Sequence, residues 1–393
     1  MTFNRYKIFT APLLLASLAP QVYARGEITH ITTELVAAIP SSYTVDGQTY
    51  EWGNGEDLIL KSIEYNGKSI EYNKFKPDTV IVRRVANSKS TGAPCSVFAQ
   101  NLGDNHKLAP SYPPTDSNGK GNCDYAKVVS SEVLNRGTLD LFANAVREKS
   151  IKNIERVDLV FSYGITTPAT GLDESGHVVI EKSGNNHVQV AAIRKLDAEG
   201  NPSSYGPLVM VNPSNFDDSS KIRYGIAYGP INVTYLANEN KAPQGYLKAV
   251  GSLEETLGIA FVSASDLGLG TNETYYGISL FSADVDSTKH TLTDPTTFPL
   301  NTGANDADDG DADLIVGTAG DFTVGIPPTS SNGQPPKAVE GNSNTKDVID
   351  IVEDNANKSG GGSGAMGIVS LLLVAGGAAS RRQRRKTAFT SKN

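Results

Sequence analysis

The chain has 393 residues, with 35 Lys and Arg against 43 Asp and Glu. Without the two basic residues of the first 24 positions and the six of the last 13, 27 basic residues face 43 acidic ones, a net charge of −16. Such a surface repels polyanions, which excludes nucleic acid and anionic membrane surfaces as partners of the middle of the chain.

The first 24 residues have the three parts of a secretory signal peptide. Arg5 and Lys7 give a positive start, residues 8–19 are apolar, and Val-Tyr-Ala at 22–24 is a small-residue cleavage pattern. Pro12 inside the apolar run and Pro20 directly after it argue against the alternative, a buried first helix. We therefore expect the chain to be exported.

Residues 25–326 predict a mainly β body, an antiparallel sandwich with one or two decorating helices, because short alternating runs recur between Gly, Asn, Asp and Pro. Asn66-Gly67 lies between two such runs and predicts a hairpin. The 177–211 stretch predicts three strands joined by turns at 183–186 and 197–203. The length of this body favours two lobes, with a division near 150–170.

Residues 137–149 break the strand pattern. Leu139, Phe142 and Val146 have helical spacing, and Thr138 is available as an N-cap. We expect an amphipathic helix here, packed on a sheet.

The chain has two cysteines, Cys95 and Cys123. An even number in an exported chain predicts one disulfide, and closing this Pro- and Gly-rich loop would stabilise the fold by about 3 kcal/mol. The alternative is two free, buried thiols.

The imidazoles and the acidic pairs give weak signals for catalysis. His177 and His187 flank the predicted turn, where a hairpin pair on the solvent face is favoured over a metal site. No nucleophile elbow, His-Glu-x-x-His or phosphate-binding loop occurs, so the sequence names no catalytic residue. Acidic pairs of the kind that glycosidases use are present, at Glu155/Asp158 and Glu254/Glu255. Arg156, between the first two, favours an ion-paired sheet surface instead.

Tyrosines gather on two runs of the body. Aromatic faces beside polar groups suit sugar rings or protein partners, although half-buried core positions are the commoner use of tyrosine in a sandwich. The candidate binding residues are Tyr224, Tyr228, Tyr235, Tyr275 and Tyr276.

An acidic loop at 305–314 is the candidate cation site. Calcium prefers several oxygen ligands on a loop that turns sharply, and Gly310 allows the turn. The spacing is not that of an EF-hand, because Ala307 falls on a ligand position. The alternative is a solvated acidic turn. The candidate Ca²⁺ ligands are Asp306, Asp308, Asp309, Asp311 and Asp313.

The C-terminal part changes composition three times. Residues 327–364 are rich in Pro, Gly, Asn and Ser and predict a stalk, except that the apolar island 348–352 predicts a short strand. Residues 365–380 form a short hydrophobic span, of which 365–379 would reach roughly 22 Å as a helix. The basic segment 381–393 is expected to stay in the cytoplasm.

This order of glycines, weak span and basic cluster resembles the GlyGly-CTERM sorting tail of Gram-negative bacteria, with a plain single-span anchor as the alternative. The residues that carry the resemblance are Gly360, Gly361, Gly362, Gly364, Arg381, Arg382, Arg384, Arg385 and Lys386, together with the span. The resemblance implies trimming by an inner-membrane rhomboid-like protease, rhombosortase, and passage through secretion machinery. The body is only broadly similar to uncharacterised bacterial surface-protein regions, through stretches such as "NIERVDLVFSYGI" and "YYGISLFSADV".

These features together predict an exported protein, located at the cell surface or outside the cell after transient anchoring in the inner membrane. The favoured function is a non-catalytic binding or structural module with a glycan or protein ligand. The alternative is a secreted hydrolase acting on polysaccharide or protein through an unrecognised carboxylate pair.

Overall fold

The computed structural model describes residues 26–351, except 46–47, 74, 87–95, 102–106, 112–124, 145–152, 238–247, 301, 303–309 and 326–343. Strands make up 57% of the described residues and helices 4%, which confirms the predicted mainly β fold class. All of the described residues belong to one compact unit, Met1–Glu353.

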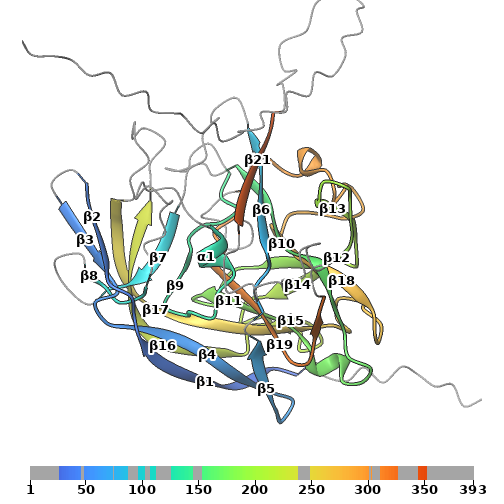
Figure 1. The fold of residues 1–393 in the computed structure, drawn as a ribbon, viewed down its shortest axis with the longest axis horizontal. Helices are drawn as coiled ribbons and strands as arrows, with labels where there is room; N and C mark the ends of the chain where they lie inside the picture. Colours follow the sequence, from blue (N-terminus) through green and yellow to red (C-terminus); the bar gives the residue numbers. More distant parts are fainter. Residues whose placement is uncertain are drawn as a thin grey trace, which may run out of the picture. The chain divides into compact units, whose positions relative to one another are not determined.

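The described strands form two large sheets and one small sheet (Figure 1). Among the described strand pairs, all are antiparallel except β14–β15, β21–β6 and β3–β8. The first sheet contains, in spatial order, β1 (Ile28–Ala37), β4 (Glu56–Tyr65), β5 (Lys68–Asn73), β19 (Leu314–Ala319), β11 (Gly176–Lys182), β17 (Lys248–Ser263), β16 (Ile226–Ala237), β7 (Ser96–Gln100) and β9 (Arg136–Thr138).

The second sheet has the order β15 (Ile222–Arg223), β14 (Val209–Asn212), β12 (Val188–Leu196), β18 (Thr274–Phe281), β10 (Ile154–Thr166), β6 (Thr79–Ala86) and β21 (Asn344–Ile351). Two short strands lie off this path: β13 (Pro202–Tyr205) pairs with β12, and β20 (Thr323–Val324) pairs with β10. The sequence suggests a division between two lobes near residues 150–170. Strand β10 covers most of this interval and pairs with β6 on one side and with β18 on the other.

The small sheet and the helices are minor elements. The sheet contains β2 (Ser41–Val45), β3 (Gln48–Trp52) and β8 (Lys107–Leu108). Within the described residues, the helices are α1 (Tyr125–Val129) and two 3₁₀ turns, η1 (Leu172–Glu174) and η2 (Pro295–Thr297). In the part of the chain that the structure describes, no helix has the length and apolar character needed to cross a membrane.

The central strands of the first sheet are apolar on both faces, and this creates two cores. On β11, Val179 belongs to the core shared with the second sheet, whereas Val178 and Ile180 belong to a second core on the opposite face. Strand β17 alternates in the same way, with Ala260 in the first core and Ile259 in the second. Because neighbouring side chains on a strand point to opposite faces, a continuous apolar run marks a strand that is buried on both sides.

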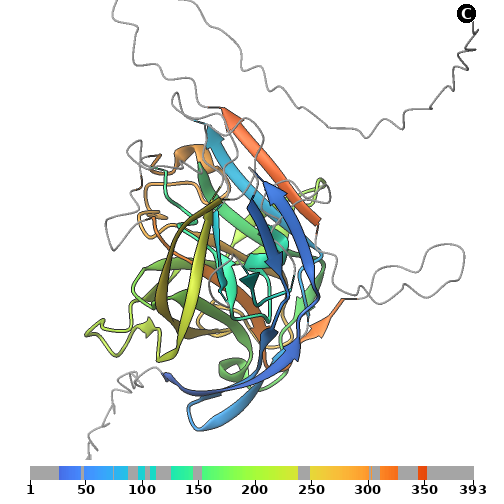
Figure 2. The ribbon, with the colours of Figure 1, turned by 90° about the vertical axis from the view of Figure 1, so that its left-hand side faces the viewer.

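The second core is closed by the curled end of the same sheet. Strands β1 and β4 form this end of the sheet (Figures 1 and 2). Leu60 and Ile63 of β4 and Ile28 of β1 pack in the cluster that contains Ile259. Strands β4 and β5 form the predicted hairpin, in which Asn66 and Gly67 have φ values of 52° and 72°, as a tight two-residue turn requires.

The helix predicted over 137–149 is wrong for the described part of that range. Residues up to Thr138 belong to β9, and Asp140 has a φ of 45°. The amides of Leu141 and Phe142 donate to the carbonyls of Ala312 and Gly310, so this backbone is satisfied by a distant segment rather than by its own turns. The helical spacing of Leu139 and Phe142 reflects two buried positions in an irregular turn.

The predicted strand in the apolar island near 348–352 is confirmed and is longer than expected. Strand β21 pairs in parallel with β6 from Asn344 against Thr79 to Ile351 against Ala86 (Figures 1 and 2). The second sheet therefore extends beyond residue 326, into the segment that composition predicts as stalk.

Several sequence predictions concern residues outside the described part of the chain. They are the signal peptide, the pairing of Cys95 with Cys123, the hydrophobic span and the sorting residues from Gly360 to Lys386. Three of the five candidate calcium ligands, Asp306, Asp308 and Asp309, also lie outside it.

Candidate binding site

The chain passes from the first sheet to the second through a corner at residues 183–187. The predicted hairpin at this turn is wrong, because β11 pairs with β17 and β19 whereas β12 pairs with β14 and β18. His177 and His187 consequently do not face each other across a ladder. His177 is buried, its Nε2 lies 2.9 Å from the Tyr275 hydroxyl, and burial lowers its pKa to about 3.

The corner runs directly over β17, and two glycines allow this. Ser183 and Gly184 have φ values of 77° and 62°. A Cβ on Gly258 of β17 would lie 2.4 Å from the Gly184 Cα and 3.1 Å from the Tyr224 Cβ. No side chain fits at that separation, so the path of the corner depends on glycine at both positions.

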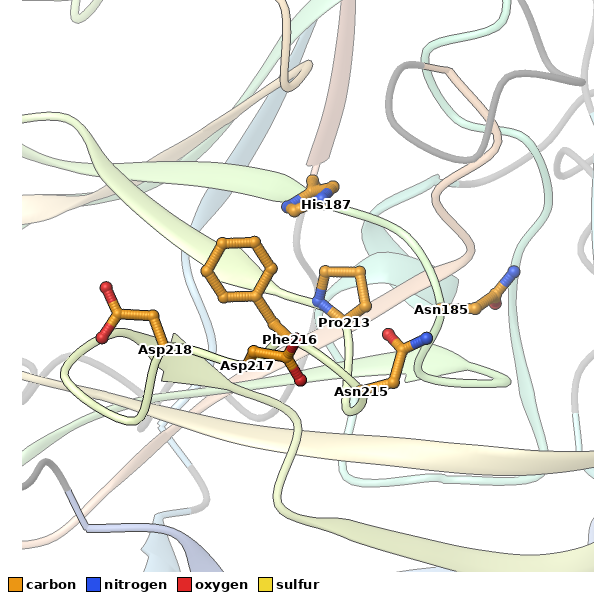
Figure 3. A pocket seen from close by; sticks show the side chains of 7 residues that line it. All are labelled: Asn185, His187, Pro213, Asn215, Phe216, Asp217 and Asp218. Atoms are coloured by element: carbon orange, nitrogen blue, oxygen red, sulfur yellow. The ribbon is translucent and has the colours of Figure 1, made fainter.

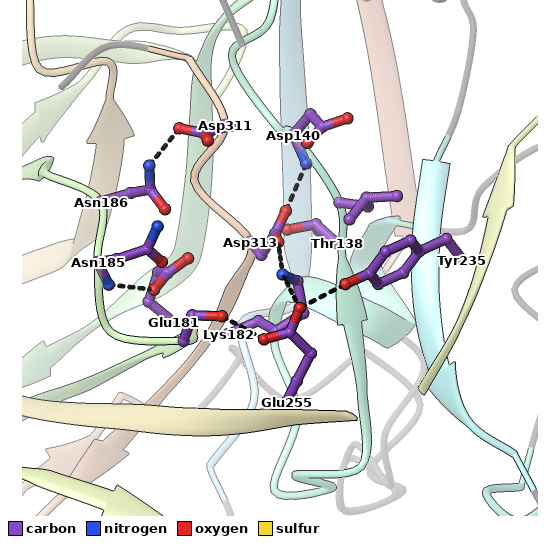
Figure 4. A network of polar contacts seen from close by, with 12 residues as sticks. Thr138, Asp140, Glu181, Lys182, Asn185, Asn186, Tyr235, Glu255, Asp311 and Asp313 are labelled. Carbon is purple, nitrogen blue, oxygen red and sulfur yellow. Dashed lines mark hydrogen bonds and ion pairs between the residues drawn. The ribbon is translucent and has the colours of Figure 1, made fainter. Parts of the chain in front are cut away.

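Three carboxylates hold the corner in place (Figure 4). The Glu181 Oε2 accepts a hydrogen bond from the Asn185 amide at 3.0 Å. The Glu255 Oε2 accepts one from the Ser183 hydroxyl at 2.5 Å, and the Asp311 Oδ1 accepts one from the Asn186 side chain. Every carboxylate acts on a different part of the turn, so the turn is fixed along its length.

Lys182 supplies the positive charge of this network (Figure 4). Its Nζ lies 2.9 Å from the Asp313 Oδ2 and 3.4 Å from the Glu255 Oε1, and 5.3 Å from the centre of the Tyr235 ring. Asp313 also accepts the Asp140 amide at 2.5 Å, and Glu255 accepts the Tyr235 hydroxyl at 2.6 Å.

Acidic groups outnumber the single lysine here, and burial raises the pKa of several of them. The pKa of Asp311 is raised to about 6, first by burial and then by the nearby Asp140 carboxylate. Burial also raises the pKa of Asp313, to about 7, although the Lys182 ammonium opposes this shift. Burial and then Asp313 raise the pKa of Glu181 well above its usual range. Protons therefore bind this network at pH values at which the same carboxylates would be ionised in the unfolded chain.

The candidate calcium ligands Asp311 and Asp313 both belong to this network. Asp313 is engaged by the Lys182 ammonium, and Asp311 faces Asn186. Among the described residues, no group of three or more acidic, His or Cys side chains is arranged to hold a metal ion. The calcium site over all five aspartates stays a prediction, because 303–309 lie outside the described residues.

A pocket of about 520 Å³ opens beside the corner (Figure 3). It is lined by Asn185, His187, Pro213, Asn215, Phe216, Asp217 and Asp218. In the close view Phe216 and Pro213 occupy the centre, His187 stands over them, and Asn185 and Asn215 lie on the side opposite Asp218.

One wall of the pocket is a closed loop, 213–221, between β14 and β15. Its ends are brought together because β14 and β15 pair in parallel and the Asn212 side-chain amide donates to the Ile222 carbonyl at 2.8 Å. The Ser214 amide donates to the Gly184 carbonyl at 2.9 Å, which joins the loop to the corner. A compact loop with adjoining ends of this kind is a common carrier of binding residues.

Phe216 is held in this loop at its backbone and at its ring. Its carbonyl accepts the Arg223 Nη1 at 2.8 Å, and the Arg223 Nε donates to Glu27 at 2.6 Å. Its ring makes an edge contact with His187, with centroids 5.8 Å apart and planes at 87°. Phe216 is half-buried, so an aromatic surface is fixed in position yet reaches the pocket.

The predicted tyrosine surface is not formed. Tyr224 and Tyr275 are buried, with 1% and 0% exposure, so neither reaches a ligand. Tyr228 and Tyr235 pack against the second core, whereas Tyr276 packs beside Ile81 in the other sheet. The tyrosines lie in two different sheets, which prevents them from sharing one face.

The candidate acidic pairs do not form an open catalytic pair. Asp158 is buried and accepts the Arg156 Nε at 2.6 Å and the Ser279 hydroxyl at 2.6 Å. Glu155 is also buried and accepts the Asn144 side chain at 2.8 Å. The predicted ion pair of Arg156 exists, but it lies in the interior rather than on the predicted sheet surface. In the second pair, Glu255 belongs to the Lys182 network and its neighbour Glu254 is exposed.

The pocket residues were not identified from the sequence. Their signal was present in the stretch "NPSNFDDSS" at 212–220, in which a single aromatic residue stands among residues typical of turns. The turn residues predict a loop. A phenylalanine in that loop indicates that its ring packs against other groups, because a fully solvated loop offers an aromatic side chain nothing to pack on.

Family models, curated proteins and solved structures were compared with the chain, and none of them matches it. The candidate site is therefore defined by its geometry: a corner fixed by carboxylates, a closed loop, and a pocket between them.

Proposed function

We propose that the chain is an exported, non-catalytic binding module displayed at the surface of a Gram-negative bacterium, and that the pocket around Phe216 receives its ligand. The observation that carries the proposal is the combination of a fixed aromatic side chain with exposed amide groups in a concave site. Ligand pockets combine an apolar surface with polar groups that orient the ligand, and here Phe216 and Pro213 supply the apolar surface.

Two buried carboxylates beside the pocket support binding rather than turnover. Glu181 and Asp313 are 0% and 3% exposed, and both are engaged in holding the corner. A general acid has to reach the atom that it protonates, and these two are enclosed. Their hydrogen bonds fix the shape of the pocket wall.

The test is a binding screen with the purified full chain, using an array of bacterial and host oligosaccharides and a panel of peptides. We expect at least one immobilised compound to bind, and to be recovered with its mass unchanged. Phe216→Ala should abolish this binding. Phe75→Ala is the matched control, because Phe75 is 43% exposed and does not line the pocket. Release of shortened products would favour the hydrolase, and equal binding by Phe216→Ala would reject the pocket.

Surface display depends on the two ends of the chain. We propose that the tail is removed within Gly360–Gly364 by the inner-membrane sorting protease, on the basis of the glycine, span and arginine order. The intact mass of protein recovered from the cell surface should lack Arg381–Lys386. A surface species that retains these residues would point to a plain anchor.

A further inference from the structure

We infer that the pocket binds an uncharged sugar ring stacked on Phe216, an inference that rests on the proposed function and gives it a ligand class. Four observations carry it: the fixed aromatic ring, the exposed carboxamides, the charge of the lining and the size of the pocket.

The aromatic ring gives the pocket an apolar platform. Phe216 is half-buried and is held through Arg223 and His187, so little side-chain freedom is left to lose on binding. A sugar ring has an apolar face made of C–H groups, and an aromatic ring is a suitable surface for it.

The rim provides hydrogen bonds that match hydroxyl groups. Asn185 and Asn215 are both exposed and lie on the same side of the pocket (Figure 3). A carboxamide donates and accepts hydrogen bonds, as a hydroxyl does, so each of these side chains can bind a hydroxyl in either sense. The backbone of Asn185 is fixed by Glu181, which keeps this group in place.

The charge of the lining selects against acidic ligands. The seven lining residues include Asp217 and Asp218 and no lysine or arginine. Asp217 and Asp218 are both exposed, and Asp218 also accepts hydrogen bonds from the amide and hydroxyl of Ser220 at 2.9 Å and 2.6 Å. A phosphate, sulfate or uronate would meet this charge unpaired, so an uncharged sugar is favoured.

The size of the pocket agrees with this class. A volume of about 520 Å³ lies in the range of small-molecule sites and accommodates one or two sugar rings.

The experiment compares neutral with acidic oligosaccharides on the full chain, using hexose and N-acetylhexosamine oligomers against uronate and sulfated ones. We expect the neutral compounds to bind at least tenfold more tightly. Phe216→Ala should weaken neutral binding at least tenfold, Phe216→Trp should retain it, and Phe75→Ala should leave it unchanged. Asp217→Lys should raise the affinity for acidic compounds, because it reverses the charge at the rim.

Equal or tighter binding of acidic sugars by the wild-type chain would overturn the inference, as would neutral binding that Phe216→Ala does not weaken. Absence of sugar binding together with Phe216-dependent binding of a peptide from the panel would reject the sugar class and keep the proposed function. Failure of the wild-type chain to bind any sugar or peptide would reject both. Thermal melts of each variant show whether a loss of binding reflects unfolding.

Discussion

The imidazole of His187 stands edge-on to the ring of Phe216, with their centroids 5.8 Å apart. His187 belongs to the corner that follows β11, and Phe216 belongs to the loop that follows β14, so this contact joins the two walls of the pocket. Changes in either wall should therefore be measurable in the binding of a ligand.

Arg223→Ala tests whether the loop is pre-organised. The change removes the hydrogen bond to the Phe216 carbonyl and the ion pair with Glu27. We expect ligand affinity to fall about three- to tenfold, mainly through faster dissociation, because the loop must then be ordered on binding. Surface plasmon resonance would measure both rates. Lys221→Ala is the control, since Lys221 is an exposed basic residue of the same loop; an equal effect of the two changes would contradict pre-organisation by Arg223.

Gly258→Ala tests the close approach of the corner to β17. The new Cβ would meet the Gly184 Cα at 2.4 Å, so the corner has to move. We expect a destabilisation of about 1–3 kcal/mol, measured by urea unfolding, together with weaker ligand binding. Gly251→Ala on the same strand is the matched control, because its nearest neighbour, the Tyr235 ring, is at 3.6 Å. If both variants were as stable as the wild type, the described path of the corner would be wrong.

The acidic network predicts that stability depends on pH in a particular direction. Burial raises the pKa of Asp313 to about 7, above the unfolded value of 3.8, so the folded state binds a proton more tightly. The resulting stabilisation is present below about pH 4 and is lost as the pH rises through 7. The free energy of unfolding of the wild type should therefore fall between pH 4.5 and 7. In Asp313→Asn this fall should be shallower, by up to about 1.4 kcal/mol per pH unit. Urea unfolding across this range measures it, with the exposed Asp321→Asn as the control; a slope identical to that of the wild type would contradict proton binding at Asp313.

The position of β21 predicts where the body can be truncated. A chain that ends after residue 326 loses a strand that forms eight register pairs with β6, and it exposes the β6 edge. We expect such a chain to melt at a lower temperature than one that ends after residue 353, and to aggregate more readily. Thermal unfolding with light scattering would compare the two. Equal melting temperatures would show that β21 adds nothing to the stability of the body.

The fold class could be predicted from local patterns, because hairpins depend on neighbouring residues. Asn66-Gly67 specifies its own turn, and β4 and β5 pair as predicted. The turn at 183–186 looks equally local, yet β11 and β12 enter different sheets. What directs them is the pairing of β11 with β17 and β19, strands that are distant in sequence.

The candidate site was harder to predict, for the same physical reason. Lys182, Glu255 and Asp313 come together only through the ladders of the first sheet, so their spacing in the sequence carries no sign of a network. Tyr224 and Tyr275 were predicted to lie on an exposed binding surface, but both are buried. Alternation along a strand shows which face of the sheet a residue lies on, but not whether another layer of the protein covers that face.

The most direct test of the binding site is fluorine NMR of the full chain labelled with 4-fluorophenylalanine. The chain has 12 phenylalanines, and the Phe216 resonance is identified by its absence in Phe216→Tyr. We predict that titration with a neutral oligosaccharide shifts the Phe216 resonance and leaves that of the exposed Phe75 in place. A Phe216 resonance that does not move while the oligosaccharide saturates the protein would contradict the proposed site.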